Sequence, residues 1–153
     1  YAYLFRAMNV QNLMNLSRQI SMKSHNTFVK VRYAETDQMG VVHHGNYAEY
    51  LEIARLDWLN TLGISYKTME QEGIMLPVYE LNFKFIKSAF FDDELRIETS
   101  LNKIPSVKIE FSYKVYNQDN ELLSTANTVL VFIDTSTRRP IKCPEYILRK
   151  LTV

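Results

Sequence analysis

One long apolar stripe, from Tyr47 to Leu62, most constrains what this chain can fold into. Apolar residues recur there at helical spacing, and charged residues fall between them. The stripe consists of Tyr47, Tyr50, Leu51, Ala54, Trp58 and Leu62, and the charged positions off it are Glu49, Glu52, Arg55 and Asp57. Gly63 then ends the predicted helix. A helix of this length with one broad apolar face needs a sheet to cover it.

The rest of the chain supplies strands for that sheet. Thr27–Tyr33 alternates apolar and polar residues, which places Val29, Val31 and Tyr33 on one face of a strand. Four more alternating segments follow the helix, at residues 78–85, 95–101, 107–115 and 122–134. Shorter helices are expected at residues 65–72 and 144–151. This order predicts an α+β fold, with helices on one face of an antiparallel sheet.

Composition narrows the class of protein further. A chain of 153 residues fits one domain, and a net charge of +1 argues against a domain built mainly to hold nucleic acid. No run of about 20 apolar residues is present, so no membrane span is expected. The single Cys143 cannot form an internal disulfide, which favours a reducing, cytoplasmic setting. We expect one domain over residues 22–153.

Residues 1–21 read as an extension of uncertain origin. They contain no acidic residue and scatter apolar side chains among polar ones, with Arg6 and Arg18 as the charged positions. This pattern fits a transit peptide, a surface-binding helix or additional sequence upstream of Met22. We leave the segment out of the functional interpretation.

The segment Tyr33–Tyr47 connects the first predicted strand to the long helix. It holds two of the four glycines and two of the three histidines. The start of a helix offers unpaired backbone N–H groups and the positive end of the helix dipole, and Asp37 lies in the approach to it. A carboxylate beside such a site suggests chemistry on a carbonyl compound. The alternative is that Asp37 only shapes a turn or caps the helix.

The residues of this segment and helix resemble the 4-hydroxybenzoyl-CoA thioesterase-like family of hotdog-fold acyl-CoA thioesterases. The resemblance covers Phe28 to Leu151. It is carried by Tyr33, Thr36-Asp37, Gly40-Val41-Val42, His44, Tyr47, Glu52, Ala54-Arg55 and the aspartate-rich stretch Phe91–Leu95. It implies a curled antiparallel sheet of about five strands wrapped around one long central helix.

The resemblance also assigns roles to residues. Asp37 would be the catalytic carboxylate, as nucleophile or general base, and the helix N-terminus at His44 would polarise the thioester carbonyl. The His44 side chain is a further candidate for assisting catalysis. The expected substrate-binding residues are Gly40, Val42, His43, Gly45, Tyr47, Lys87 and Lys103, with the two lysines as candidates for the phosphates of coenzyme A. His43 could serve in packing or in acyl contact.

No cofactor is expected, and no metal either, because the adjacent His43 and His44 side chains diverge and no clear ligand set stands nearby. The partners implied are an acyl-CoA substrate and further copies of this chain, as a homodimer or homotetramer with active sites between protomers. Two alternatives stay open, namely an acyl-carrier-protein thioesterase and a non-catalytic protein that binds acyl thioesters. The sequence does not indicate whether the acyl group is aliphatic or aromatic.

Overall fold

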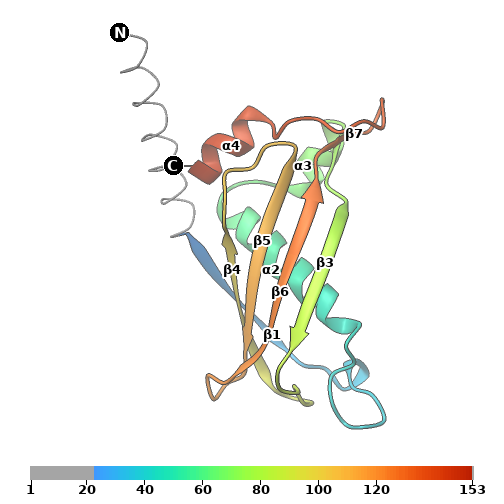
Figure 1. The fold of residues 1–153 in the computed structure, drawn as a ribbon, viewed down its shortest axis with the longest axis vertical. Coiled ribbons are helices and arrows are strands. Elements are labelled where there is room, and N and C mark those ends of the chain that lie inside the picture. Colours follow the sequence, from blue (N-terminus) through green and yellow to red (C-terminus); the bar gives the residue numbers. More distant parts are fainter. Residues whose placement is uncertain (1–22, 153) are drawn as a thin grey trace.

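The computed structural model of the protein describes residues 23–152. The predicted extension at residues 1–21 lies outside the described part. Within it, five antiparallel strands form one sheet and a long helix crosses behind that sheet (Figure 1). The strands are β1 (Ser24–Lys30), β3 (Val78–Phe85), β4 (Glu94–Leu101), β5 (Lys108–Tyr116) and β6 (Leu122–Val131). The predicted α+β class and the count of about five strands in the main sheet are confirmed.

The strand order β1-β4-β5-β6-β3 places two strands from the beginning of the fold at opposite edges of the sheet. Consecutive hairpins join β4, β5 and β6, whereas β1 pairs with β4 and β3 pairs with β6 across long stretches of sequence. β3 runs toward the end of the sheet where the connection to the long helix lies (Figure 1). This end of β3 therefore reaches the segment that carries Asp37.

The long helix, α2 (Asn46–Thr61), supplies the centre of the core. The predicted stripe is buried except for Leu62, which is partly buried, and Leu51 and Ala54 are fully enclosed. The stripe faces alternate residues of β4 and β5 such as Ile97 and Phe111. Arg55 differs from the prediction. We expected it off the buried face, but only 6% of its surface is exposed. Its charge partly offsets the rise that burial causes in the pKa of the Tyr66 and Tyr113 phenols. The long aliphatic stem of arginine allows this placement.

Two of the strand predictions, at β1 and β3, were wrong in detail. Tyr33 does not continue β1, because the chain leaves the sheet after Lys30 and forms a 3₁₀ turn at Tyr33–Glu35, which leaves Tyr33 77% exposed. In β3, a register shift between Val78 and Glu80 moves Tyr79 out of the face shared by Leu81, Phe83 and Phe85. A bulge of this kind inserts one residue and reverses the alternation that a regular strand would show.

Short elements complete the fold. β7 (Ile133–Asp134) is separate from β6, where one continuous strand was expected, and it pairs with β2 (Ile74–Met75) in a second, two-stranded sheet. Helix α3 (Tyr66–Gln71) is capped by the Ser65 side chain, and helix α4 (Glu145–Thr152) follows Pro144. Among the described residues, no helix is long and apolar enough to cross a membrane.

Candidate active site

The loop between the 3₁₀ turn and α2 holds Asp37 in a defined orientation. The Asp37 N–H donates to the Val41 carbonyl at 2.9 Å, and its own carbonyl accepts from the Gly40 N–H at 2.9 Å. Gly40 has a φ of 78°, a conformation that favours glycine. One side-chain oxygen of Asp37, Oδ1, accepts the Met39 N–H at 2.8 Å. The described part of the chain shows no hydrogen bond to Oδ2, so this oxygen is available to a ligand.

The N-terminus of α2 lies beside this loop and has one unused donor. Gly45, the residue before the helix, has no side chain with which to cap it. The Gly45 N–H donates to His43 Nδ1 at 3.1 Å, and the Asn46 N–H donates to the His43 carbonyl at 3.0 Å. In the described part of the structure the His44 N–H donates to no other group. Together with the positive end of the helix dipole, it forms a site for a polarised oxygen.

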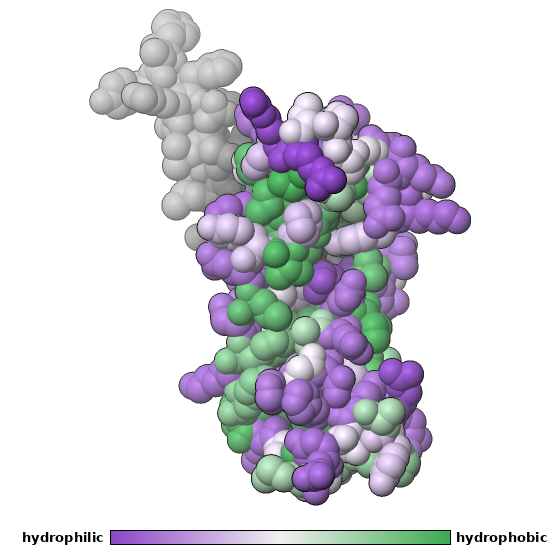
Figure 2. Space-filling view, turned by 90° about the vertical axis from the view of Figure 1, so that its right-hand side faces the viewer, coloured by the Kyte–Doolittle hydropathy of each residue, from purple (hydrophilic) through white to green (hydrophobic). Residues whose placement is uncertain are grey.

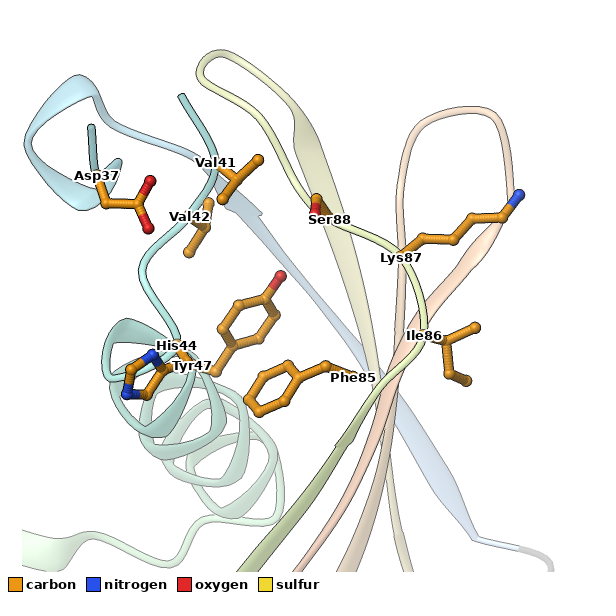
Figure 3. A pocket seen from close by; sticks show the side chains of 9 residues that line it. All are labelled: Asp37, Val41, Val42, His44, Tyr47, Phe85, Ile86, Lys87 and Ser88. Carbon is orange, nitrogen blue, oxygen red and sulfur yellow. The ribbon is translucent and has the colours of Figure 1, made fainter. Parts of the chain in front are cut away.

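A pocket of about 310 Å³ opens between this loop, the start of α2 and the end of β3 (Figure 3). Its lining residues are Asp37, Val41, Val42, His44, Tyr47, Phe85, Ile86, Lys87 and Ser88. Five of these were predicted from the sequence, namely Asp37, Val42, His44, Tyr47 and Lys87. Residues 85–88 come from the last residue of β3 and the segment after it, and their approach to the loop depends on how the sheet folds.

The inner wall of the pocket is aromatic. The Tyr47 ring lies edge-on to Phe85, with 5.2 Å between centroids, and Phe85 stacks on Phe83 at 5.3 Å. Tyr47 is only 2% exposed, and burial raises the pKa of its phenol, so the phenol stays neutral at ordinary pH. The wall therefore offers an apolar surface to a bound group.

Other predicted site residues lie in the loop without lining the pocket. The His43 ring is exposed and accepts from Gly45, so it shapes the entry to the helix. A Cβ atom at position 45 would lie 3.1 Å from His43 Nδ1. The His43 ring therefore fills the space beside Gly45. Gly40 permits the turn beside Asp37.

The two predicted lysines lie at opposite ends of the sheet. Lys87 is at the pocket and forms an ion pair with Glu121 at 2.9 Å. Lys103 follows β4 at the far end and pairs with Glu110 at 2.9 Å. The described residues contain no cluster of His, Cys, Asp or Glu that could hold a metal ion. Glu52 and Arg55, two residues of the resemblance that lie three apart on α2, form no ion pair with each other in the described part of the structure.

Glu35 is a residue of this region that the sequence did not single out. It is buried two positions before Asp37, where its carboxylate contacts Arg32 and Tyr50. The spacing of Arg32 and Glu35, three residues apart, was the only local signal. Its contact with Tyr50 joins residues 15 positions apart and depends on the folded structure.

A five-stranded antiparallel sheet around one long helix, with a pocket lined by Asp37 and by residues at the start of that helix, is the arrangement expected of hotdog-fold thioesterases. The chain belongs to the thioesterase-like superfamily, whose family model matches residues 31–151. It is 32% identical over 114 residues to the YneP protein of Bacillus subtilis, covering 74% of this chain and 83% of that protein. It is 28% identical over 120 residues to the acyl-CoA thioester hydrolase YbgC of Escherichia coli, covering 78% and 90%.

Solved structures agree with this assignment. The DHNA-CoA thioesterase of Staphylococcus aureus superimposes with a TM-score of 0.76 at 40% identity, covering 78% of this chain and 80% of that one. A 4-hydroxybenzoyl-CoA thioesterase mutant shares the fold with a TM-score of 0.76 at 22% identity, covering 85% of this chain and 99% of that one. The predicted hotdog fold and family are confirmed, and the chain is a thioester hydrolase.

Proposed function

We propose that the protein hydrolyses acyl-CoA thioesters to a free carboxylic acid and coenzyme A, with Asp37 as the catalytic carboxylate. One observation carries this proposal: Asp37 and His44 line the same pocket, and the described residues show no hydrogen bond to Asp37 Oδ2 or from the His44 N–H. The names of the Escherichia coli and Staphylococcus aureus relatives support the substrate class. A thioester suits a site with so few groups, because the departing thiolate has a conjugate pKa of about 8.5 and needs no strong general acid.

The His44 N–H would bind the thioester oxygen and stabilise the oxyanion. A donor of this kind contributes about 10²–10³ in rate when it points at the developing charge. The neighbouring Gly45 N–H already donates to His43 Nδ1. The dipole of α2 adds to the effect of the remaining donor. The exposed His44 ring stays a candidate for contact with the substrate.

Asp37 would act through Oδ2, since Oδ1 is held by the Met39 N–H. In one route Oδ2 forms a bond to the carbonyl carbon, the C–S bond breaks to release the thiolate, and water then hydrolyses the mixed anhydride. In the other route Oδ2 takes a proton from a water whose oxygen attacks the same carbon, the C–S bond breaks, and the proton passes from Asp37 to the departing thiolate. Both routes end with the free acid, the thiol and a regenerated Asp37 carboxylate. The fixed Oδ1 supports either one, because it orients the reacting oxygen before substrate binds.

The acyl group would lie against the aromatic wall. Tyr47 and Phe85 present ring surface to the pocket, and the neutral phenol adds no charge. The coenzyme A portion would extend out of the pocket past Lys87, whose side chain is 57% exposed even while it pairs with Glu121. Lys103 can meet the phosphates only from another subunit, because it lies at the opposite end of its own sheet.

We also propose that two copies of the chain pair along β3. This edge strand exposes apolar side chains on the face of the molecule shown in Figure 2, with Val78 at 45%, Leu81 at 43% and Phe85 at 50%. An unprotected edge of this length invites pairing with another strand. A two-fold axis near Leu81 would set the two β3 strands antiparallel. The Val78 end of one subunit would then lie beside the Phe85 end of the other, so the Asp37 pocket would lie between protomers. Dimer and tetramer both satisfy this arrangement.

Asp37→Asn is the variant that tests the catalytic proposal. Thiol release would be measured on a panel of short, medium, long and aromatic acyl-CoAs, with circular dichroism to show that the variant is folded. We expect the parent to turn over at least one ester and kcat to fall by at least about 10²-fold in Asp37→Asn. Equal turnover by both proteins would remove Asp37 from the reaction. No turnover of any CoA ester by the folded parent would favour the carrier-protein or binding-only alternative.

The cytoplasmic location and the single domain over residues 22–153 stay predictions. The burial of Cys143 supports the predicted cytoplasmic location. Its side chain is buried, and burial raises the pKa of the thiol to about 12, which leaves it unreactive. A buried, uncharged thiol is compatible with a compartment that keeps cysteines reduced.

A further inference from the structure

Glu35 is a buried carboxylate with an unusually full set of partners. Only 6% of its surface is exposed. Its Oε1 accepts the Arg32 backbone N–H and the Tyr50 hydroxyl, both at 2.8 Å. Its Oε2 accepts Arg32 Nε and lies 3.0 Å from Arg32 Nη2. A charge is retained in such a place only when its hydrogen bonds replace the water it has lost.

Tyr50 links this carboxylate to α2. It lies one helical turn after Asn46, and its ring is 1% exposed. Burial raises the pKa of the Glu35 carboxyl, but the bonds from the Arg32 N–H, the Tyr50 hydroxyl and the Arg32 guanidinium outweigh burial and hold the pKa below its usual value. Glu35 therefore stays ionised at neutral pH, and the 3₁₀ turn is tied to the helix through one charge-assisted hydrogen bond.

The backbone of the same residue closes the loop from the other side. The Glu35 carbonyl accepts the His43 N–H at 2.9 Å and the Asn46 side-chain amide at 2.8 Å. Residues 35 and 46 are thus joined directly, and the segment between them carries both Asp37 and His44. One residue anchors the approach to Asp37, the exit from the loop and the first turn of α2.

From this arrangement we infer that Glu35 and Tyr50 are positioning residues, which set the separation between the Asp37 carboxylate and the His44 N–H. The inference rests on the proposed function, because it assumes that these two groups act on one thioester. Reacting groups need placement to within about 0.5 Å, and a misplacement of about 1 Å can cost about 10²-fold in rate. Neither Glu35 nor Tyr50 lines the pocket, so both act through the loop and not on the substrate.

Tyr50→Phe tests this most directly, because it removes one oxygen atom and keeps the buried ring. Tyr113→Phe is the matched control: Tyr113 is also 1% exposed, and its hydroxyl lies 2.9 Å from Thr128 Oγ1, on β5 and β6 away from the loop. We expect Tyr50→Phe to lower kcat by about 10–100-fold with KM within about threefold of the parent. Tyr113→Phe should lower Tm by a similar amount and leave both constants unchanged.

Glu35→Gln is the second variant, since it keeps the size of the side chain and removes the charge. Like Tyr50→Phe, it should reduce kcat and leave KM nearly constant. If it does not fold, Tyr50→Phe and its control decide the inference. A kcat for Tyr50→Phe within about twofold of Tyr113→Phe would overturn it and leave Glu35 as an anchor for stability alone.

A double-mutant cycle with Asp37→Asn separates this inference from the proposed function. If Tyr50 acts through Asp37, Tyr50→Phe should cost less than about twofold in the Asp37→Asn background. A full additional loss there would overturn the inference. An Asp37→Asn protein with parental activity would defeat the catalytic assignment of Asp37. A strongly impaired Asp37→Asn beside a fully active Tyr50→Phe would defeat the positioning inference alone.

Discussion

The two edges of the main sheet differ in what they present to the surroundings. On β1, polar side chains are engaged by neighbouring elements: His25 and Thr27 both lie 2.7 Å from Asp57 on α2, and Asn26 accepts from Arg96 on β4. On β3, apolar side chains such as Leu81 and Phe85 are exposed. Bonded polar groups protect an edge strand from pairing with other chains, and exposed apolar groups do not. β1 also exposes one apolar side chain, Phe28, at 61%, but β3 exposes several. The contrast supports the proposal that another subunit pairs along β3.

A charge placed in the middle of β3 should have the largest effect on this contrast. Leu81→Asp would put two carboxylates near the two-fold axis of the proposed dimer, where like charges repel. We expect the molar mass in light scattering coupled to size exclusion to fall by half, which for a dimer means the 18.0 kDa of a single chain. Activity should fall by at least about 10-fold, since the pocket would lose its neighbouring subunit.

Asn26→Asp supplies the control for that prediction. It introduces the same charge at the middle of β1, where the partner is the Arg96 guanidinium. The assembly and the activity should both match the parent. If Asn26→Asp dissociates the assembly and Leu81→Asp does not, the subunits pair along β1 and the comparison is reversed.

Phe85→Ala should have an intermediate effect, because Phe85 belongs to both the β3 edge and the pocket. The substitution removes the ring that packs on Tyr47 and Phe83. We expect KM for the preferred acyl-CoA to rise by about 5–20-fold, which corresponds to about 1–2 kcal/mol of lost apolar contact. Short acyl groups that do not reach the wall should be affected least. An equal rise in KM for every acyl length would place Phe85 outside the acyl site.

The polar protection of β1 can be tested through pH. Hydrogen bonds from Thr27 and then His25 hold the pKa of Asp57 below its usual 3.8. A lowered pKa stabilises the fold above the unfolded value, and this stabilisation is lost as the pH falls through the folded value. Asp57→Asn should therefore lower Tm by at most about 3 °C at pH 7, because Asp57 is partly exposed. The difference from the parent should close below pH 3.8. A constant difference across this range would mean that the ionised carboxylate contributes nothing.

Lys87→Ala should have the smallest effect of the set. Lys87 is exposed and already forms an ion pair with Glu121, so its attraction for a phosphate is weakened. We expect KM to rise by about twofold at low salt and to match the parent at about 0.5 M salt, where surface charges are screened. A tenfold rise that persists at high salt would assign Lys87 a direct contact with the substrate.

The sequence predicted the elements whose pattern is local. The stripe on α2 and the alternation in β4 and β5 follow from spacing alone, and burial in the structure agrees with them. The connection that carries Asp37 was placed by the same means, between an alternating strand and a helical stripe, and Gly40 takes a positive φ in its turn. The roles of Asp37 and His44 came from the family resemblance. Local spacing thus accounts for most of the fold and for the loop that carries the candidate site.

The features that the sequence missed depend on contacts between distant residues. Tyr33 continues the alternation of β1, but the chain turns away from the sheet so that Glu35 can reach Tyr50. Arg55 reads as a surface residue on a helical projection, and only the folded chain brings Tyr66 and Tyr113 to it. Phe85 and Ile86 join the pocket because β3 ends beside the loop. The spacing of residues along one element carries no information about any of these long-range contacts.

The strand order has a consequence for how the chain acquires its structure during synthesis. The apolar stripe of α2 leaves the ribosome well before β4, β5 and β6, which form the local meander that covers it. β3 also stays unpaired during this time, because it ends at Phe85 and its partner β6 begins 37 residues later, at Leu122. Contacts between residues far apart in sequence form slowly, and exposed apolar segments are then open to aggregation. We therefore expect a nascent chain that stops before Leu122 to depend on chaperones, and one that extends past Val131 to become independent of them.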